Sequence, residues 1–148
     1  MPIHWVCKSF NELTAPECYA ILQLRNQVFV VEQQCIFQDA DNKDQGSHHS
    51  MGWDGDTLAA YARLVPAGIA YRETSIGRVA INSQFRNAGL GRELMIRSIA
   101  MIHTIFGDQS IRIGAQLYLQ KFYESLGFEK ISDIYIEDGI QHIEMMLK

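Results

Sequence analysis

Hydrophobic and polar residues follow three different patterns in the first third of the chain. The loosely alternating stretch HWVCKS, residues 4–9, is typical of a strand. Residues 14–33 keep apolar side chains at a rough helical spacing, and they begin with Thr14 as an N-cap and Pro16 in the first turn. Residues 38–50 are polar and contain glycine, which indicates a solvated acidic loop.

The middle of the chain alternates between strand and helix periodicity. Residues 51–56 and 57–65 predict a hairpin that turns near Gly55, because Asp-Gly is a favoured hairpin dipeptide. Another strand covers 74–82, in which Gly77 indicates a bulge or a close backbone approach. A helix follows, with one apolar stripe formed by Leu90, Leu94, Ile99, Ile102 and Phe106.

The last third of the chain predicts one more helix between strands. Residues 110–116 form a short strand, and residues 117–127 form a helix whose last residue, Gly127, suits a left-handed C-terminal cap. Two closing strands flank the hairpin dipeptide Asp138-Gly139. The order strand, helix, three strands, helix, strand, helix, two strands predicts an α+β protein organised around a sheet.

Composition is that of an ordinary globular protein. Of 148 residues, 47% are apolar and 20% charged, so we expect residues 1–148 to form a single domain. The net charge of -4 argues against nucleic acid as a partner. Three cysteines without a Cys-x-x-Cys spacing indicate reduced thiols. The sequence shows no secretory leader pattern and no apolar run that could span a bilayer, which predicts a cytoplasmic location away from membranes.

The stretch RNAGLGREL, residues 86–94, places two glycines at the entrance of the predicted helix. A helix N-terminus carries unpaired N–H groups and the positive end of the helix dipole, and an anion can approach these amides where side chains are absent. Gly89 and Gly91 leave such an opening, and Arg86 and Arg92 add positive charge at its rim. The pattern indicates a pyrophosphate-binding loop, with a tight strand-to-helix turn as the alternative. Rossmann and Walker loops do not fit, because the third glycine of one and the G-K-[ST] of the other are missing.

A second motif follows about thirty residues later. The stretch KFYESLGF has the pattern F-Y-x-x-x-G-F, and it follows the R-x-x-G-x-G pattern of the first loop. Both motifs, and the order of strands and helices over essentially the whole chain, resemble the GCN5-related N-acetyltransferase (GNAT) superfamily. The stretches RNQVFVVEQQCIFQDADNKD, YARLVP, IGRVAI and YIEDGIQHIEMM resemble its ElaA-type branch. Two residues depart from the pattern: Gln116 replaces the frequent asparagine of the family, and Gln141 replaces the usual proline of the branch.

The resemblance implies a GNAT-like acyl-CoA N-acyltransferase fold, with a mixed, mostly antiparallel sheet of about seven strands flanked by helices. It implies an enzyme that transfers the acetyl group of acetyl-coenzyme A (acetyl-CoA) to a primary amine. In that family the first loop binds the pyrophosphate, the strand before it pairs with the pantetheine arm, and a tyrosine protonates the leaving thiolate. The matching tyrosine is Tyr123, whose phenol, with an ordinary pKa of about 10, stays protonated at neutral pH. The implied cofactor-binding residues are Val79, Ala80, Ile81, Arg86, Asn87, Ala88, Gly89, Leu90, Gly91, Arg92 and Gln116.

The sequence determines the acceptor side less sharply. A general base must take a proton from an amine that is mostly protonated at neutral pH. Four residues flank the expected acceptor cleft and are candidates for substrate binding or for this base: Glu32, His49, Glu137 and His142. Each has a structural alternative, such as a helix-end charge or a turn residue.

The acidic stretch 39–44 raises the question of a metal. It departs from the EF-hand pattern, and the adjacent histidines after it lack the spacing of zinc ligands, so we expect no metal and an acidic loop that attracts a cationic acceptor. A non-catalytic acyl-CoA-binding module or sensor with the same fold is the alternative function. The closing strands offer an edge through which a homodimer could form.

Overall fold

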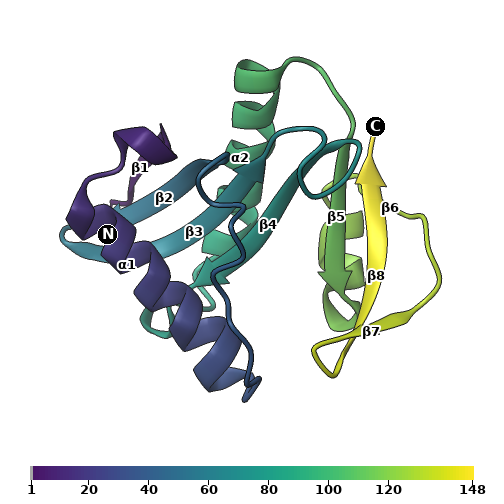
Figure 1. Ribbon diagram of the computed structural model, residues 1–148, viewed down its shortest axis with the longest axis horizontal. Helices are drawn as coiled ribbons and strands as arrows, with labels where there is room; N and C mark the ends of the chain where they lie inside the picture. Colours follow the sequence, from purple (N-terminus) through teal and green to yellow (C-terminus); the bar gives the residue numbers. More distant parts are fainter. Residues whose placement is uncertain (1) are drawn as a thin grey trace.

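A computed structural model of the protein describes residues 2–148 and contains an eight-stranded mixed sheet with helices on both of its faces (Figure 1). The strands are β1 (His4–Ser9), β2 (His48–Asp54), β3 (Thr57–Val65), β4 (Thr74–Ile81), β5 (Ile111–Gln116), β6 (Glu129–Lys130), β7 (Tyr135–Glu137) and β8 (Ile140–Leu147). The α-helices are α1 (Ala15–Arg25), α2 (Leu90–Phe106) and α3 (Gln120–Glu124). The π-helical turn is η2 (Asn26–Glu32), and the 3-10 turns are η1 (Phe10–Glu12), η3 (Ser83–Phe85) and η4 (Leu117–Leu119). The α+β class and the mostly antiparallel sheet are confirmed.

The sheet has one more strand than expected, because the first closing strand is interrupted. Its strand order is β1-β2-β3-β4-β5-β8-β6, and β7 also pairs with β8. Lys130 pairs with Met145 and Tyr135 pairs with His142, so residues 131–134 must bulge out over the two residues of β8 between these pairs. The bulge divides the strand into β6 and β7.

β4 and β5 are the parallel pair of the sheet, and they separate. They pair only at Thr74–Ile111 and Ser75–Arg112 within residues 2–148, so their carboxyl-terminal halves are not paired with each other. Figure 1 shows the two strands diverging from this short seam. We call this opening the split. It leaves one edge of β4 without a strand partner.

Helices cover the two faces of the sheet and bury two clusters of side chains. On the face of α2, Leu94, Met95 and Ile102 are fully buried against Ile111 and Ile113 of β5, together with residues of β3, β4 and β8. On the face of α1, buried side chains of that helix pack against β2 and β3. The expected apolar stripe of α2 is confirmed. No helix within residues 2–148 is long and apolar enough to cross a membrane.

The first helix begins as predicted and ends differently. The Thr14 hydroxyl accepts from the Glu17 amide at 3.2 Å, and the Glu17 carboxylate accepts from the Thr14 amide at 2.8 Å, which forms a capping box. Regular α-helix stops at Arg25, and the chain continues as the π-helical η2 to Glu32. A local rewinding of this kind changes the direction of side chains and is frequent at functional sites.

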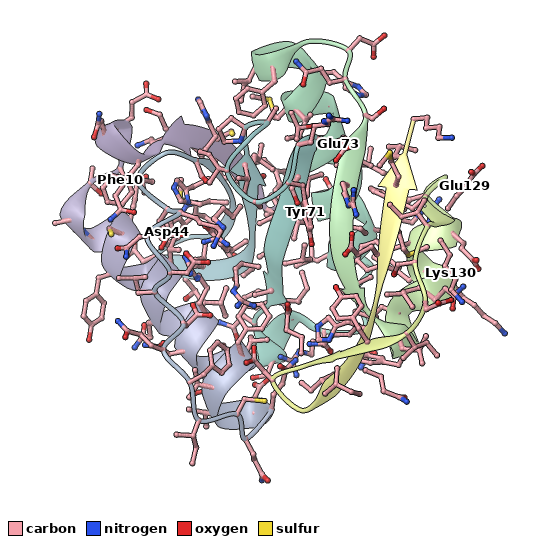
Figure 2. All side chains as sticks on the ribbon, turned by 45° about the vertical axis from the view of Figure 1, so that its right-hand side comes forward. Phe10, Asp44, Tyr71, Glu73, Glu129 and Lys130 are labelled. Atoms are coloured by element: carbon pink, nitrogen blue, oxygen red, sulfur yellow. The ribbon has the colours of Figure 1, made fainter. Side chains whose placement is uncertain are left out.

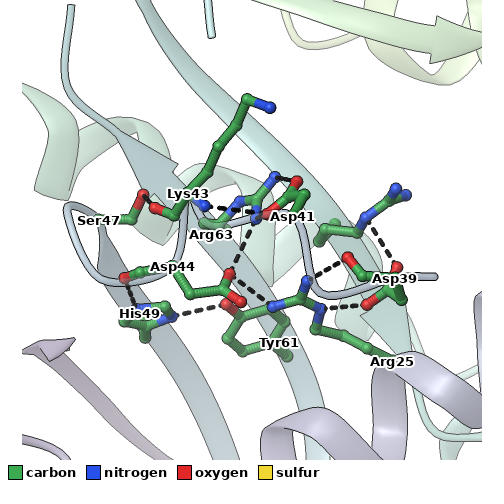
Figure 3. Close-up of polar contacts among 10 residues, drawn as sticks. Arg25, Asp39, Asp41, Lys43, Asp44, Ser47, His49, Tyr61 and Arg63 are labelled. Carbon is green, nitrogen blue, oxygen red and sulfur yellow. Dashed lines mark hydrogen bonds and ion pairs between the residues drawn. The ribbon is translucent and has the colours of Figure 1, made fainter. Parts of the chain in front are cut away.

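The loop predicted over 38–50 is neither wholly a loop nor solvated. His48–Ser50 belong to β2, and the aspartates before them turn inward. Arg25, which has no exposed surface, donates from Nε to Asp39 and from Nη1 to Asp44, both at 2.7 Å. Arg63 donates from Nη1 to Asp44 at 2.8 Å and from both terminal nitrogens to Asp41 at 2.7 and 2.9 Å (Figure 3).

This charge network contains three arginines and three aspartates, since Arg78 Nε also lies 3.1 Å from Asp39 Oδ1. Buried charges must be paired, and each carboxylate here meets at least one guanidinium. The loop therefore stabilises the turn of the chain between η2 and β2. The expectation that its aspartates attract a cationic acceptor is wrong, because arginines of the same chain already bind them.

Candidate active site

A cavity of about 850 Å³ lies at the carboxyl end of the split, a size usual for small-molecule sites. Its lining residues come from η2, β4, the segment before α2, the first turn of α2, and the region of η4 and α3. They are Val28, Glu32, Gln33, Val79, Ile81, Phe85, Arg86, Asn87, Gly89, Gly91, Arg92, Tyr118, Leu119, Phe122 and Tyr123. Both sequence motifs therefore face one cavity. A groove of similar volume between β1 and α1 contains none of the motif residues.

The N-terminus of α2 opens into this cavity without a side-chain cap. Gly89 is the N-cap residue, its φ of 76° lies in the left-handed region that favours glycine, and no side chain hydrogen-bonds to the first-turn amides. A Cβ on Gly91 would lie 3.9 Å from Phe122 Cζ and 4.0 Å from Ile81 Cγ1, so packing within the protein does not require glycine there. The free amides and the space beside them suit an anionic ligand.

Two arginines connect the loop to the other walls of the cavity. Arg86 donates to the Ile81 carbonyl at 3.0 and 3.2 Å and to Glu32 Oε1 at 2.6 Å. Arg92 donates to the Ser125 hydroxyl, just after α3, at 2.9 Å. Glu32 does line the cavity, but its carboxylate accepts from Arg86 rather than standing free.

The edge of β4 that faces the split is shaped by a bulge. The register between β3 and β4 shifts between Tyr61 and Arg63, and Arg78 has a φ of 50°. The bulge that Gly77 indicated is therefore present, with its strained residue one position later. The Arg78 guanidinium lies 4.7 Å from the centre of the Phe29 ring, a cation–π contact in which the face of the ring attracts the positive charge.

Tyr123 lies on the wall formed by α3 and is only 7% exposed. Its ring packs edge to face against Phe122 at 5.1 Å and against Phe128 at 5.9 Å between ring centres. Burial raises the pKa of Tyr123 to about 12, with a smaller contribution from Tyr118. The hydroxyl is therefore a neutral donor over the whole physiological range of pH.

The remaining acceptor-side candidates do not line this cavity. His49 is 1% exposed and lies on β2 facing α1, where its ring nitrogens are 2.6 Å from the Tyr61 hydroxyl and 3.0 Å from the Asp44 carbonyl oxygen. Burial lowers its pKa, so the imidazole is neutral, donates to Asp44 and accepts from Tyr61. Glu137 and His142 lie together on β7 and β8, 3.7 Å apart.

Some positions were missed or only partly anticipated. Gln116, at the end of β5, pairs with His142 across the strands and is absent from the cavity lining. Ala80 lines the opposite side of β4 and is buried against the α1 face. Tyr118 and Phe122 line the cavity but were not among the predicted site residues, although their spacing of four residues along the predicted helix was a usable signal.

A parallel strand pair that separates beside an uncapped, glycine-rich helix N-terminus is the architecture of the acyl-CoA N-acyltransferases, and this is the class that the fold defines. Residues 22–148 match the model of the acetyltransferase (GNAT) domain, and the chain belongs to that family. Enzymes of this family transfer acyl groups from acyl-CoA. No group of three potential metal ligands occurs among the residues that the structure describes.

Individual relatives agree over almost the whole chain. Protein ElaA of Escherichia coli is 39% identical over 145 residues, which cover 97% of this chain and 95% of that protein. The crystal structure of an acyl-CoA N-acyltransferase from Pseudomonas aeruginosa superimposes with a TM-score of 0.95 at 39% identity, covering 99% of this chain and 100% of the other. An aminoglycoside 6'-N-acetyltransferase complexed with coenzyme A shares the fold at a TM-score of 0.70 and 14% identity, over 95% of both chains.

Proposed function

We propose that this protein is an N-acetyltransferase that transfers the acetyl group of acetyl-CoA either to a primary amine of a small molecule or to an exposed amino group. The observation that carries the proposal is the open N-terminus of α2. Its amides and the space beside Gly91 face the same cavity as the side chain of Tyr123.

In this proposal the loop 86–92 binds the pyrophosphate. The amides of Leu90, Gly91 and Arg92 point out of the first turn of α2 and donate to the phosphate oxygens. Asn87 lines the approach, and Arg86 and Arg92 supply positive charge at the rim. Ala88, which is outside the cavity lining, contributes only through the course of the loop. The unpaired edge of β4 at 79–81 accepts the pantetheine arm as a further strand would. Gln116, at the end of β5, contributes its amide from the opposite edge of the split.

The bound thioester supplies the acetyl group, and the protein supplies position and a proton. The lone pair of the amine nitrogen forms the new C–N bond at the carbonyl carbon, while the C–S bond breaks and its electron pair stays on sulfur. Tyr123 gives its phenolic proton to that sulfur, and a protonated, buried tyrosine suits this role. Backbone N–H groups at 79–81 stabilise the negative charge that develops on the carbonyl oxygen.

The amine must also lose a proton, which restores the phenol through solvent. Of the four candidate bases, Glu32 is the one that lines the cavity, and its contact with Arg86 is exposed enough to exchange with water. We propose that Glu32 takes this proton, directly or through a water. Glu32→Gln would then lower kcat more than it changes binding of acetyl-CoA.

Calorimetric titration of acetyl-CoA tests the binding site first. Gly91→Ala fits the protein without a clash and favours the helix by up to about 1 kcal/mol, but its methyl group occupies the space beside the amides. We therefore expect equal or higher stability together with at least about tenfold weaker binding, corresponding to about 1.4 kcal/mol. Glu93→Gln, in the same turn but outside the cavity, is the control and should bind like the wild type.

Thiol release with a panel of primary amines tests the chemistry. We expect Tyr123→Phe to lower kcat by about a hundredfold, within the usual range for a general acid, while acetyl-CoA binds as before. A wild-type protein that does not bind acetyl-CoA would refute the proposal as a whole. Binding without thiol release from any amine would support the non-catalytic acyl-CoA-binding module instead.

A further inference from the structure

A second polar surface lies across the split from the cavity, on the face of the sheet that carries α1. Alternate residues of β5 point to this face, because Ile111, Ile113 and Ala115 fill the core on the α2 side. The register places Gly114 opposite Glu144, and places His142 beside both Gln116 and Tyr135. Figure 1 shows no helix covering β5, β7 and β8 on this side.

Two tyrosines from distant segments meet above Gly114. A Cβ on this glycine would lie only 2.9 Å from the Tyr71 hydroxyl oxygen and 3.0 Å from the Tyr135 hydroxyl oxygen, so a larger residue would displace one of them. Tyr71 comes from the connection between β3 and β4, and its side chain lies where β4 and β5 diverge (Figure 2). We call Gly114, Tyr71 and Tyr135 the tyrosine notch.

The hydroxyls of the notch are available to a ligand. Neither makes a hydrogen bond to another residue in the described part of the chain, although the Arg112 guanidinium stacks 5.1 Å from the Tyr71 ring centre. Burial and the nearby carboxylates raise the pKa of Tyr71, and burial, Tyr71 and Glu137 raise that of Tyr135 to about 12. Both groups are neutral phenols whose lone pairs can accept from an N–H donor.

Carboxylates outnumber cations around the notch. Arg112 donates to Glu144 and lies 3.6 Å from Glu73, so a single guanidinium is shared by two carboxylates. Glu137, at the end of β7, adds a third carboxylate near His142. The one guanidinium and the three carboxylates together carry a formal charge of -2. Arg78 of β4, across the split, does not offset this charge because it is already paired with Asp39.

The tyrosine notch lies beside the split, on the face of the sheet opposite α2. Gly114 lies in the part of β5 that no longer pairs with β4, so the notch opens toward the split from the side opposite α2. The Cys35 thiol, just after η2, donates to the Asp138 carbonyl oxygen in the β7–β8 turn at 3.4 Å, which connects these two segments. The segment after η2 and the β7–β8 hairpin therefore meet at this contact.

We propose that the tyrosine notch binds the acceptor amine and that the surplus carboxylates select an alkylamine with a second positive charge over one with a negative charge. This inference rests on the proposed acetyl transfer. The hydroxyls of Tyr71 and Tyr135 accept from the amine N–H groups and orient its lone pair toward the split. Glu137 and Glu144 attract the distal cation, and they repel a distal carboxylate.

Three four-carbon amines that differ only at the far end test the selection. They are 1,4-diaminobutane with a distal cation, butylamine with a neutral methyl group, and 4-aminobutanoate with a distal anion. We expect kcat/KM to fall in that order, with at least about a tenfold difference between the diamine and 4-aminobutanoate, corresponding to about 1.4 kcal/mol. Glu137→Gln should reduce the preference for the diamine over butylamine.

Variants of the notch separate acceptor binding from binding of the donor. Tyr71→Phe and Tyr135→Phe each remove one hydrogen bond to the amine and should raise KM for 1,4-diaminobutane by about tenfold, corresponding to about 1.4 kcal/mol. Calorimetry should show unchanged affinity for acetyl-CoA and weaker binding of the diamine to the coenzyme A complex. Tyr19→Phe, at an exposed position of α1, is the matched control and should change neither value.

The outcomes distinguish the two proposals. Thiol release in which 4-aminobutanoate equals or exceeds the diamine, or in which both Tyr→Phe variants keep the wild-type KM, would overturn the notch while leaving acetyl transfer intact. A protein that binds acetyl-CoA and transfers to other amines, but to none of these three, would also overturn it. Failure to bind acetyl-CoA at all would instead refute the proposed function.

Discussion

The charge network beneath the 38–47 segment predicts a large loss of stability on removal of Asp44. Its Oδ1 accepts from Arg25 at 2.7 Å and from Arg63 at 2.8 Å, and the two guanidinium side chains are 0% and 7% exposed. In Asp44→Ala both lose a shared carboxylate, and the network changes from three positive and three negative groups to an excess positive charge.

The magnitude follows from the partners that remain. Breaking a buried ion pair by removing one member costs about 3–5 kcal/mol, because the other charge stays buried. Arg25 keeps Asp39 and Arg63 keeps Asp41, so we expect the lower end, about 3 kcal/mol. For a chain of this length, that loss lowers Tm by roughly 6–12 °C.

Urea unfolding at pH 7 measures this loss, with the slope of free energy against urea checked for a common unfolded state. Asp108→Ala is the control, since its side chain is 98% exposed, and it should stay within about 0.5 kcal/mol of the wild type. Asp44→Asn keeps a neutral acceptor and should fall between the two. If Asp44→Ala loses less than about 1 kcal/mol, the carboxylate does not balance these arginines and the reasoning is wrong.

Three further predictions concern acid stability, packing and the pH dependence of catalysis. Burial works to raise the pKa of Asp41, but hydrogen bonds from Arg63 outweigh it and hold the pKa at about 2. The ionised Asp41 therefore stabilises the folded state at pH values above the unfolded pKa of about 3.9, and this contribution is lost as pH falls toward 2. Denaturant unfolding at pH 4, 3 and 2 should therefore show a shallower decline for Asp41→Asn, and parallel curves would contradict the assignment. Gly52→Ala would place a methyl group 2.8 Å from a ring carbon of Trp5 and should lower the free energy of unfolding by about 1–3 kcal/mol, as measured by thermal unfolding. Gly77→Ala is the control, because a methyl group there meets nothing within 4 Å. Equal effects of the two variants would show that the Trp5 ring moves aside freely. Because the pKa of Tyr123 is raised to about 12, Tyr123→Phe should lower the rate without moving any inflection between pH 7 and 10, and loss of an inflection there would show that the phenol ionises in that range.

The parts of the fold with strong local signals were predictable. The capping box at Thr14, the apolar stripe of α2 and the turn at Asp138-Gly139 each depend on residues a few positions apart. The two motifs around Gly89 and Tyr123 also predicted that a common site would exist, and the structure places them on one cavity.

The parts that escaped prediction depend on partners far apart in the sequence. A polar stretch such as 38–50 is typical of a solvated loop, and only the fold shows that Arg25 and Arg63 lie beneath it. The tyrosine notch needs Tyr71 and Tyr135 to meet over one glycine of β5, a contact that no local pattern encodes. His49 was misplaced for the same reason, since its partners are set by strand register and burial.

The short seam between β4 and β5 also divides the chain into two modules. Strands β1–β4 all precede α2 and strands β5–β8 all follow it, so the backbone passes from one module to the other only once within residues 2–148. A break at the exposed Asp108 would yield two polypeptides that keep all their strand pairings except the short β4–β5 seam. A ligand held in the split contacts both pieces and binds only the assembled form, so its binding would drive their association by mass action. We expect the protein to work as a two-fragment reporter that reassembles in response to acetyl-CoA.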